Sequence, residues 1–363
     1  MKILHIINSL AGGGAERLVS QIVPLMNKNY IQCDVLILSS INDIYSNYLI
    51  EHGVFVNFLP YKNMFDPRIP FYFYQFIKHY KYDIIHAHLF PTIYWTSLIT
   101  YFNRKKVRFV MTEHNTYNKR RKIFWLVYFE RIIYYRYAKI ISISKGTQDN
   151  LIKWLKPHNE IDKYIVIENG ILINEYKNAT SFSRSEFEIT ENITLLCMVG
   201  RFTIQKNHKN MMKAMTLLPE KVHIVLIGDG EYKECIQELV KELKITHRVY
   251  FLGFRTDVAR IIKTSDIFVI PSLWEGFGLV SIEAMACGIP IAASDVSGLR
   301  EIIGNCGVFF NPNNPEDIAN KLNILINNIE FRLNCIEKGF INVEKYNINL
   351  MVKRYIELYK NIY

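Results

Sequence analysis

Short apolar runs rich in β-branched residues alternate along the chain with segments whose apolar residues recur at helical spacing. In the first half, strand-like runs lie at 2–8, 34–38, 54–59, 83–86, 107–111, 139–143 and 164–167. Helical spacing separates them, for example over 15–26 and 145–154. Repeated alternation of this kind predicts a parallel sheet that helices cover on both faces.

This alternation breaks and then starts again. Glu168-Asn169-Gly170 is a turn signal, and 178–192 is polar. New strand-like runs follow at 193–199, 222–227, 249–252, 267–270, 290–293 and 307–310, with helical patterns near 207–217, 231–244, 256–263, 279–287 and 316–328. We therefore predict an α/β fold of two doubly wound, Rossmann-like domains, residues 1–170 and 171–348, facing a central cleft. The segment 349–363 has helical spacing, and we expect it to pack back on the first domain.

One stretch needs to be weighed as a membrane span. Residues 84–103 contain no Asp, Glu, Lys or Arg, but they include two histidines, a proline and several threonines. A span of that length should be mostly apolar, so we predict a strand, a loop and an amphipathic helix instead. We find no signal peptide, and the six cysteines form no C-x-x-C pair, which suits a reducing compartment. A cytoplasmic protein is the expectation.

The net charge of +10 is concentrated in one part of the chain. Residues 104–145 contain 12 basic and 2 acidic side chains, whereas 169–363 contain 22 of each. Aromatic residues follow the basic run 119–122, as in helices that bind anionic membranes. We predict that 104–145 binds an anionic membrane surface, and we find no motif for nucleic acid. A buried helix with a solvated basic end remains the alternative.

Three glycines follow the first predicted strand, at Gly12, Gly13 and Gly14. Glycines let the backbone approach a ligand, and the helix that follows offers unpaired N–H groups to an anion. The spacing is not G-x-G-x-x-G, and no acidic residue ends the next strand, so a dinucleotide-dependent dehydrogenase is not expected. A plain tight turn is the alternative.

Two basic residues, Arg201 and Lys206, lie in the loop after the first strand of the second domain. Both could reach one phosphate-bearing ligand, or both could be ordinary solvated charges.

The stretch from 270 to 290 has the order strand, glycine loop, helix and next strand. Glu275 precedes the helix and Glu283 lies about one turn inside it, while Gly276 and Gly278 expose backbone N–H groups at its start. Amides can hold a diphosphate, and carboxylates can accept hydrogen bonds from hydroxyls. A nucleotide sugar therefore suits this loop; a carboxylate that only caps the helix is the alternative.

No metal site is predicted. His86 and His88 would share one face of a strand, but no third ligand is evident, and the chain contains no Asp-x-Asp pair.

Taken together, these motifs resemble those of a known enzyme family. Glu275-Gly276-Phe277-Gly278-Leu279 with Glu283 resembles the Glu–seven residues–Glu motif of retaining glycosyltransferases of the GT-B fold, in particular family four, the glycosyltransferase group 1 proteins of bacterial polysaccharide and glycolipid synthesis. Other motifs occur in the family's order, namely Gly12-Gly13-Gly14-Ala15-Glu16, Thr112-Glu113-His114-Asn115, Asn169-Gly170-Ile171, Arg201 with Lys206, and Gly228-Asp229-Gly230.

The resemblance implies a role for each residue. Arg201 and Lys206 would neutralise a leaving diphosphate in place of a metal. Glu275 would hold sugar hydroxyls, and Glu283 the ribose. His114 would contact the donor sugar and help to position the acceptor. The remaining binding residues implied are Gly13, Gly14, Gly253, Phe254, Gly276, Phe277, Gly278 and Leu279.

The activity implied is retaining transfer of a hexose from a nucleotide diphosphate sugar, with UDP expected, to a glycan or lipid-linked acceptor in surface polysaccharide or glycoconjugate synthesis. Neither metal nor cofactor is expected, and the location expected is the inner face of the plasma membrane. A GT-B-fold nucleotide-sugar epimerase, or a non-catalytic nucleotide-sugar-binding protein, is the alternative.

Overall fold

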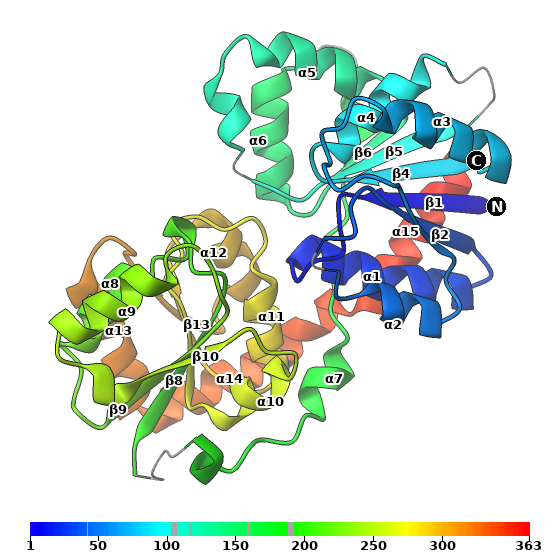
Figure 1. Cartoon of the computed structure of the whole chain (residues 1–363). Helices are drawn as coiled ribbons and strands as arrows, with labels where there is room; N and C mark the ends of the chain where they lie inside the picture. Colours follow the sequence, from blue (N-terminus) through cyan, green and yellow to red (C-terminus); the bar gives the residue numbers. More distant parts are fainter. Residues whose placement is uncertain (42, 103–106, 117, 158–159, 188–191) are drawn as a thin grey trace. The chain divides into compact units, whose positions relative to one another are not determined.

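The computed structural model describes residues 1–363 except 42, 103–106, 117, 158–159 and 188–191. Two compact units make up the chain. One contains Met1–Gly170 together with Ile348–Tyr363, and the other contains Ile171–Asn347. Each unit has a sheet of its own with helices on both faces (Figure 1). The predicted α/β fold with two doubly wound units is confirmed.

The sheet of the first unit is parallel, and its strands run in the order β3-β2-β1-β4-β5-β6-β7. Every predicted strand is present, with ends within two residues of the prediction. The strands are β1 (Lys2–Ile7), β2 (Gln32–Ile37), β3 (Val56–Phe58), β4 (Ile84–His88), β5 (Arg108–Glu113), β6 (Lys139–Ser142) and β7 (Tyr164–Val166).

Helices cover both faces of this sheet. They are α1 (Gly14–Lys28), α2 (Ser46–Glu51), α3 (Ile69–Tyr80), α4 (Thr92–Thr100), α5 (Leu126–Tyr135), α6 (Lys145–Leu155) and α15 (Ile348–Ile362), with short 3-10 turns η1 (Lys119–Lys122) and η2 (Ile161–Lys163). The C-terminal helix α15 lies beside α1 (Figure 1), and the Tyr359 hydroxyl is 2.6 Å from Nδ1 of His86 on β4.

The stretch 84–103 forms β4 and α4 where the structure describes it, as predicted. Within the described residues, no helix combines the length and the apolar character needed to cross a membrane.

The sheet of the second unit is also parallel, in the order β10-β9-β8-β11-β12-β13. Its strands are β8 (Thr194–Val199), β9 (Val222–Ile227), β10 (Val249–Gly253), β11 (Ile267–Ile270), β12 (Ile291–Ser294) and β13 (Gly307–Phe310). Its helices are α7 (Ile173–Lys177), α8 (His208–Met215), α9 (Lys233–Glu242), α10 (Val258–Thr264), α11 (Leu279–Ala286), α12 (Ser297–Ile303), α13 (Pro315–Asn327) and α14 (Ile329–Val343), with 3-10 turns η3 (Arg184–Phe187), η4 (Ile204–Lys206), η5 (Thr246–Arg248) and η6 (Glu344–Tyr346).

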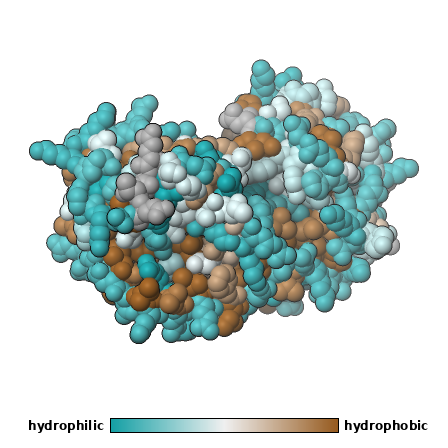
Figure 2. Space-filling model, turned by 90° about the horizontal axis from the view of Figure 1, so that it is seen from below, coloured by the Kyte–Doolittle hydropathy of each residue, from teal (hydrophilic) through white to brown (hydrophobic). Residues whose placement is uncertain are grey.

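The strands are apolar because helices bury both of their faces. β1 and β9, for example, are buried along nearly their whole length. Some large apolar side chains still reach the surface, and the face seen in Figure 2 is mostly hydrophilic with several apolar patches. An exposed apolar side chain by itself therefore marks no site.

Strand order fixes where ligands can bind. In the first unit the order reverses between β1 and β4, and in the second unit between β8 and β11. In open α/β sheets, the loops that follow the two neighbouring strands at such a point run to opposite faces, and ligands bind between them at the carboxyl edge of the sheet. The predicted residues Arg201, Lys206 and 275–278 lie in the loops after β8 and β11, and Leu279 begins the helix that follows β11.

Candidate active site

The loops after β8 and β11 are joined by hydrogen bonds. The Leu273 amide donates to the Gln205 carbonyl at 2.8 Å, and the Gln205 side chain donates to the Trp274 carbonyl at 2.9 Å. Buried Asn207 donates to the Pro271 carbonyl at 3.0 Å. Two segments about 70 residues apart thus form one structural unit at the switch point.

Glycines let the loops after β8 and β9 pack backbone to backbone. Gly228 has a φ of +136°, and a Cβ there would overlap the Gly200 carbonyl. Gly230 has a φ of +155°, and a Cβ there would overlap the carbonyl of Phe202. The Phe202 amide also donates to the Asp229 carbonyl at 3.0 Å. This close packing determines the path of the loop that carries Arg201.

Lys206 and Glu275 form an ion pair across the joined loops. Lys206 Nζ lies 2.9 Å from Glu275 Oε2, with the two side chains 17% and 12% exposed. The stem of Lys206 packs over Gly200, where a Cβ would lie 3.1 Å from it. Arg201 lies in the same loop as Lys206, and its side chain is exposed. An anionic ligand at Lys206 would therefore compete with Glu275 for the ammonium group.

Helix α11 begins next to the ion pair. Gly278 has a φ of +76° and turns the chain into the helix, where the first N–H groups have no partner within the helix. The Gly278 carbonyl accepts from Ser281, whose amide is 2.8 Å away. Phe277 is buried, and its ring packs against Tyr346. Glu283 is buried one turn inside the helix.

The other predicted residues lie at further strand ends. Gly253 ends β10 with a φ of +67°, its carbonyl accepts from the Gly228 amide at 2.8 Å, and Phe254 is half exposed. In the first unit, Gly13 precedes α1 and Gly14 begins it. A Cβ on Gly13 would overlap the carboxylate of Glu16, which therefore folds back over the start of this helix.

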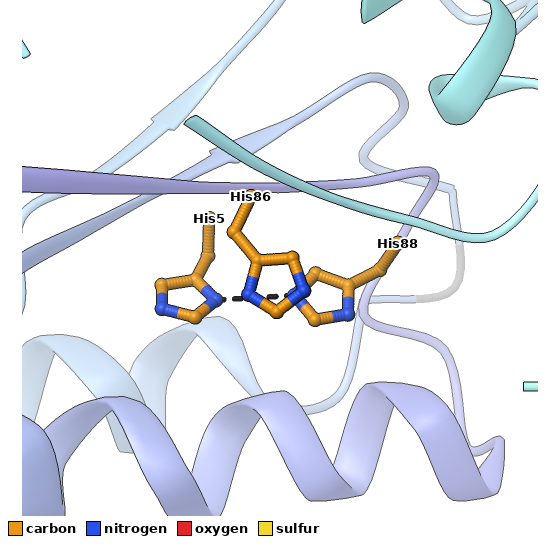
Figure 3. Close-up of side chains that lie close together, drawn as sticks. All are labelled: His5, His86 and His88. Atoms are coloured by element: carbon orange, nitrogen blue, oxygen red, sulfur yellow. Dashed lines mark hydrogen bonds between the residues drawn. The ribbon is translucent and has the colours of Figure 1, made fainter. Parts of the chain in front are cut away.

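His114 belongs to a cluster of histidines that the sequence did not reveal. The expectation that His86 and His88 lack a third partner was wrong, because His5 on β1 pairs in register with His86 on β4. The three rings lie side by side on one face of the sheet, and a dashed line joins His5 to His88 (Figure 3). Burial lowers the pKa of His5 to about 3 and that of His114 to about 4.

The cluster fits a hydrogen-bonded network better than a metal centre. Zinc ligand nitrogens at about 2.0–2.1 Å from the metal lie about 3.4 Å apart in a tetrahedron. Nitrogens of His5, His86 and His88 lie within 4.8 Å of one another. Both nitrogens of His86 already have hydroxyl partners, Tyr359 at 2.6 Å and Thr112 at 2.7 Å. A metal would have to displace one of these hydroxyls.

The basic run 119–122 is not a uniform surface. Arg120 lies 3.5 Å from buried Glu130, and Arg121 lies 3.2 Å from buried Glu113. These two arginines are turned toward the protein and pair with buried carboxylates, so they add little to the exposed charge of this stretch. Residues 104–106 and 117 lie outside the described residues, and so does the Lys119 side chain.

The aromatic residues that follow this run are exposed. Phe124 is 78% exposed and Tyr128 is 65% exposed, while Ile133 and Tyr134 on the opposite side of α5 are buried. The alternative of a buried helix therefore holds for one side of α5 only. We call the exposed side the aromatic surface; it consists of Phe124, Trp125, Tyr128, Phe129, Ile132 and Tyr135.

Family models match both units. The model described as glycosyl transferases group 1 matches residues 179–341, and the model described as glycosyltransferase family 4 matches residues 12–174. The chain belongs to the group 1 glycosyltransferases. The resemblance to the group 1 glycosyltransferase family that the sequence showed is thereby confirmed.

Relatives of this glycosyltransferase match over most of its length. An uncharacterised glycosyltransferase of Methanocaldococcus jannaschii is 29% identical over 77% of the chain and 75% of its own length. The UDP-Gal:alpha-D-GlcNAc-diphosphoundecaprenol alpha-1,3-galactosyltransferase of Escherichia coli is 27% identical over 79% of the chain and 77% of its own length. The crystal structure of Anabaena HepE in complex with UDP and glucose has a TM-score of 0.87 and 20% identity, covering 99% of this chain and all of that one.

Within the glycosyltransferase, the structure brings together one group of the predicted residues. Lys206, Glu275 and the start of α11 lie on joined loops of the second unit, with Arg201 in the same loop as Lys206. Gly13, Gly14 and His114 lie in the first unit. Sequence reasoning missed Gln205, which ties the two loops together, and His5; neither belongs to a motif, and only the fold reveals their partners.

Proposed function

We propose that this glycosyltransferase moves a sugar from a nucleoside diphosphate sugar, with UDP as the nucleotide, to a lipid-linked or glycan acceptor. The main support is that Lys206, Glu275 and the N-terminus of α11 come together at the switch point of the second sheet. The E. coli relative is named for a UDP-galactose donor and a diphosphoundecaprenol acceptor, and the HepE structure contains UDP, which supports the same class of donor and acceptor here.

In this proposal the diphosphate replaces Glu275 as the ion-pair partner of Lys206. The ammonium group and the Arg201 guanidinium neutralise the two phosphates, and the N–H groups of Gly278 and Leu279 donate to a phosphate oxygen. Glu275, released from the ion pair, accepts hydrogen bonds from the hydroxyls of the transferring sugar. The ion pair thus holds both side chains in place before the donor binds.

The transfer retains the configuration of the sugar. The bond between the anomeric carbon and the diphosphate oxygen breaks, and the acceptor oxygen bonds to that carbon on the same face. The departing phosphate oxygen takes the proton of the acceptor hydroxyl, so atoms and charge balance without a carboxylate base. Arg201 and Lys206 stabilise the growing charge on the diphosphate, and no metal is required.

The remaining predicted residues complete the proposal. Glu283 accepts hydrogen bonds from the ribose hydroxyls, and the backbone at Gly253 and Phe254 contacts the base. Gly14 at the start of α1 offers its backbone N–H group to the donor, and Gly13, whose own N–H donates to the Ala11 carbonyl, lets the donor approach the backbone. His114 contacts the transferring sugar.

Transfer is tested by incubating the protein with a panel of UDP-sugars, with and without undecaprenyl-diphosphate-linked acceptors, and following the products by mass spectrometry. We expect UDP release that depends on the acceptor, together with an acceptor heavier by one sugar. Interconversion of the free donor without transfer would identify an epimerase instead. Binding of UDP-sugar with neither outcome would identify a non-catalytic binding protein.

We also propose that the aromatic surface binds an anionic membrane at the inner face of the cell membrane, close to a lipid-linked acceptor. Phe124, Trp125 and Tyr128 would enter the headgroup region, and the exposed Lys122 and Arg136 would attract anionic lipid.

Co-sedimentation with vesicles tests the membrane proposal. We expect binding to vesicles that contain anionic lipid, and loss of that binding in Phe124→Ser/Trp125→Ser. The matched control is Phe71→Ser, which removes an exposed aromatic residue from α3. Equal vesicle binding by the two variants would show that the aromatic surface does not bind the membrane. Binding to an oligonucleotide and not to vesicles would instead indicate nucleic acid as the partner of this stretch.

A further inference from the structure

Three histidines form a chain of two hydrogen bonds that ends at His114. Nδ1 of His5 lies 3.1 Å from Nε2 of His88, and Nδ1 of His88 lies 3.1 Å from Nε2 of His114. The residues come from β1, β4 and the end of β5, which are neighbours in the sheet. His86 packs against His88 with ring centroids 4.1 Å apart, but its own nitrogens face Tyr359 and Thr112.

Each bond of the chain requires one N–H and one lone pair. Burial lowers the pKa of all three rings well below its ordinary value, so each ring is neutral at pH 7 and carries one N–H. Because each ring has only one proton, the two bonds must point the same way. The N–H groups all donate either from His5 toward His114 or from His114 toward His5.

The far end of the chain distinguishes these two arrangements. Among the described residues, Nε2 of His5 is buried and has no hydrogen-bond partner. If the chain donates toward His114, that atom is a lone pair. If the chain donates toward His5, it is a buried N–H without an acceptor, which proteins rarely tolerate. The first arrangement is therefore favoured, and it leaves the proton of His114 on Nδ1.

We propose that His5 and His88 are positioning residues that fix the ring of His114 and keep its proton on Nδ1, so that the neutral imidazole acts as a hydrogen-bond donor. This inference rests on the proposed function only for the identity of the recipient, which is an oxygen of the transferring sugar. It makes His114 a donor rather than a general base. If Nδ1 of His114 carried a lone pair instead, it could accept a hydrogen bond but could not donate one to a sugar oxygen.

The state of His114 is read directly by long-range ¹H–¹⁵N spectra of the full chain labelled at histidine, which distinguish a protonated Nδ1 from a protonated Nε2. We expect the Nδ1-protonated form of His114 in the wild-type protein at pH 7. His88→Leu removes the donor and should yield a mixture of the two forms. His88→Asn places an amide nitrogen close to the former Nδ1, so it should restore the wild-type form.

His86→Gln is the matched control, because it alters the same buried cluster but leaves the chain intact. We expect it to retain the Nδ1-protonated form. In His5→Phe, Nε2 of His88 becomes the buried end of the chain and has no acceptor, so the Nδ1-protonated form of His114 should be retained there too. The spectrum of the wild-type protein keeps the test open if His88→Leu fails to fold. In transfer assays, kcat should fall about tenfold to a hundredfold in His88→Leu and by no more than about threefold in His88→Asn.

Three outcomes would overturn the inference: a proton on Nε2 of His114 in the wild-type protein or in His5→Phe, an unchanged spectrum in His88→Leu, or stoichiometric zinc binding that requires His5 and His88. The spectra need no substrate. Absence of glycosyltransferase activity would therefore refute the proposed function and leave the proton position as a separate result.

Discussion

Lys206 offers the sharpest test of how the donor is held. Lys206→Met keeps most of the stem that packs over Gly200 and removes the charge that lies 2.9 Å from Glu275. Losing one prearranged donor to a developing negative charge typically costs about 3 kcal/mol in the transition state, or a roughly hundredfold lower kcat. The loss of this mostly buried ion pair should cost about 2–3 kcal/mol of folding free energy, between the values for exposed and fully buried pairs, so the protein should remain folded.

The same substitution in a Glu275→Gln background separates two roles of Lys206. If the ammonium group acts on the diphosphate, Lys206→Met lowers kcat about a hundredfold in both backgrounds, because the effect does not depend on the carboxylate. If Lys206 only holds Glu275 in place, the double variant is no slower than Glu275→Gln alone. The assay measures UDP release in the presence of acceptor, and Lys209→Met, an exposed lysine three residues further on, is the control. The second result would refute the reasoning.

Three further predictions concern stability and metal. Gly228→Ala should lower the free energy of unfolding by more than about 2 kcal/mol, because the new Cβ would overlap the Gly200 carbonyl, whereas Gly53→Ala, also at positive φ but in open space, should cost about 1 kcal/mol; equal losses measured by urea unfolding would contradict the packing argument. In the folded protein His5 stays neutral down to about pH 3, whereas an unfolded histidine takes up a proton below about pH 6.5. The contribution of His5 to the free energy of unfolding is therefore fully present above about pH 6.5 and is lost as the pH falls below it. Between pH 7 and pH 5 the free energy of unfolding should therefore fall by about 2 kcal/mol less in His5→Phe than in the wild type. The same pH dependence of the unfolding free energy in both proteins would contradict the burial of His5 as a neutral ring. Transfer activity should survive EDTA, and strict dependence on added Mn²⁺ or Mg²⁺ would show that the metal-free assignment is wrong.

The sequence predicted the strands well, because a strand buried on both faces must be an apolar run and the alternation with helices leaves few other folds. It predicted the helices less completely. Helix α3, Ile69–Tyr80, is dense in Phe and Tyr, so its apolar positions have no clear helical spacing. Its helical state depends on packing of Phe73 and Ile77 in the core, which composition does not show.

The sequence predicted the part of the site that consists of residues adjacent in the chain. It did not predict the contacts that strand order and register create between distant residues. Glu275 to Leu279 are contiguous, so a glycine loop before a helix identified them. The Lys206–Glu275 pair joins residues 69 positions apart, and His5 meets His88 across 83. Such contacts follow from strand order and register, which a single sequence does not encode in any local pattern.

The charge of the basic stretch shows the same limit. The sequence counts twelve basic side chains in 104–145 but does not tell which face solvent. Arg120 and Arg121 turn inward because Glu130 and Glu113 are buried and need cationic partners. The exposed aromatic residues of α5 likewise depend on which side of the helix packs on the sheet.

The most direct measurement is a crystal structure of the full chain with UDP bound. We predict that the diphosphate lies within about 3 Å of the Lys206 ammonium and the Arg201 guanidinium, that a phosphate oxygen accepts from the Gly278 and Leu279 amides, and that Glu275 is released from Lys206. A diphosphate bound elsewhere, with the Lys206–Glu275 pair still intact, would contradict it.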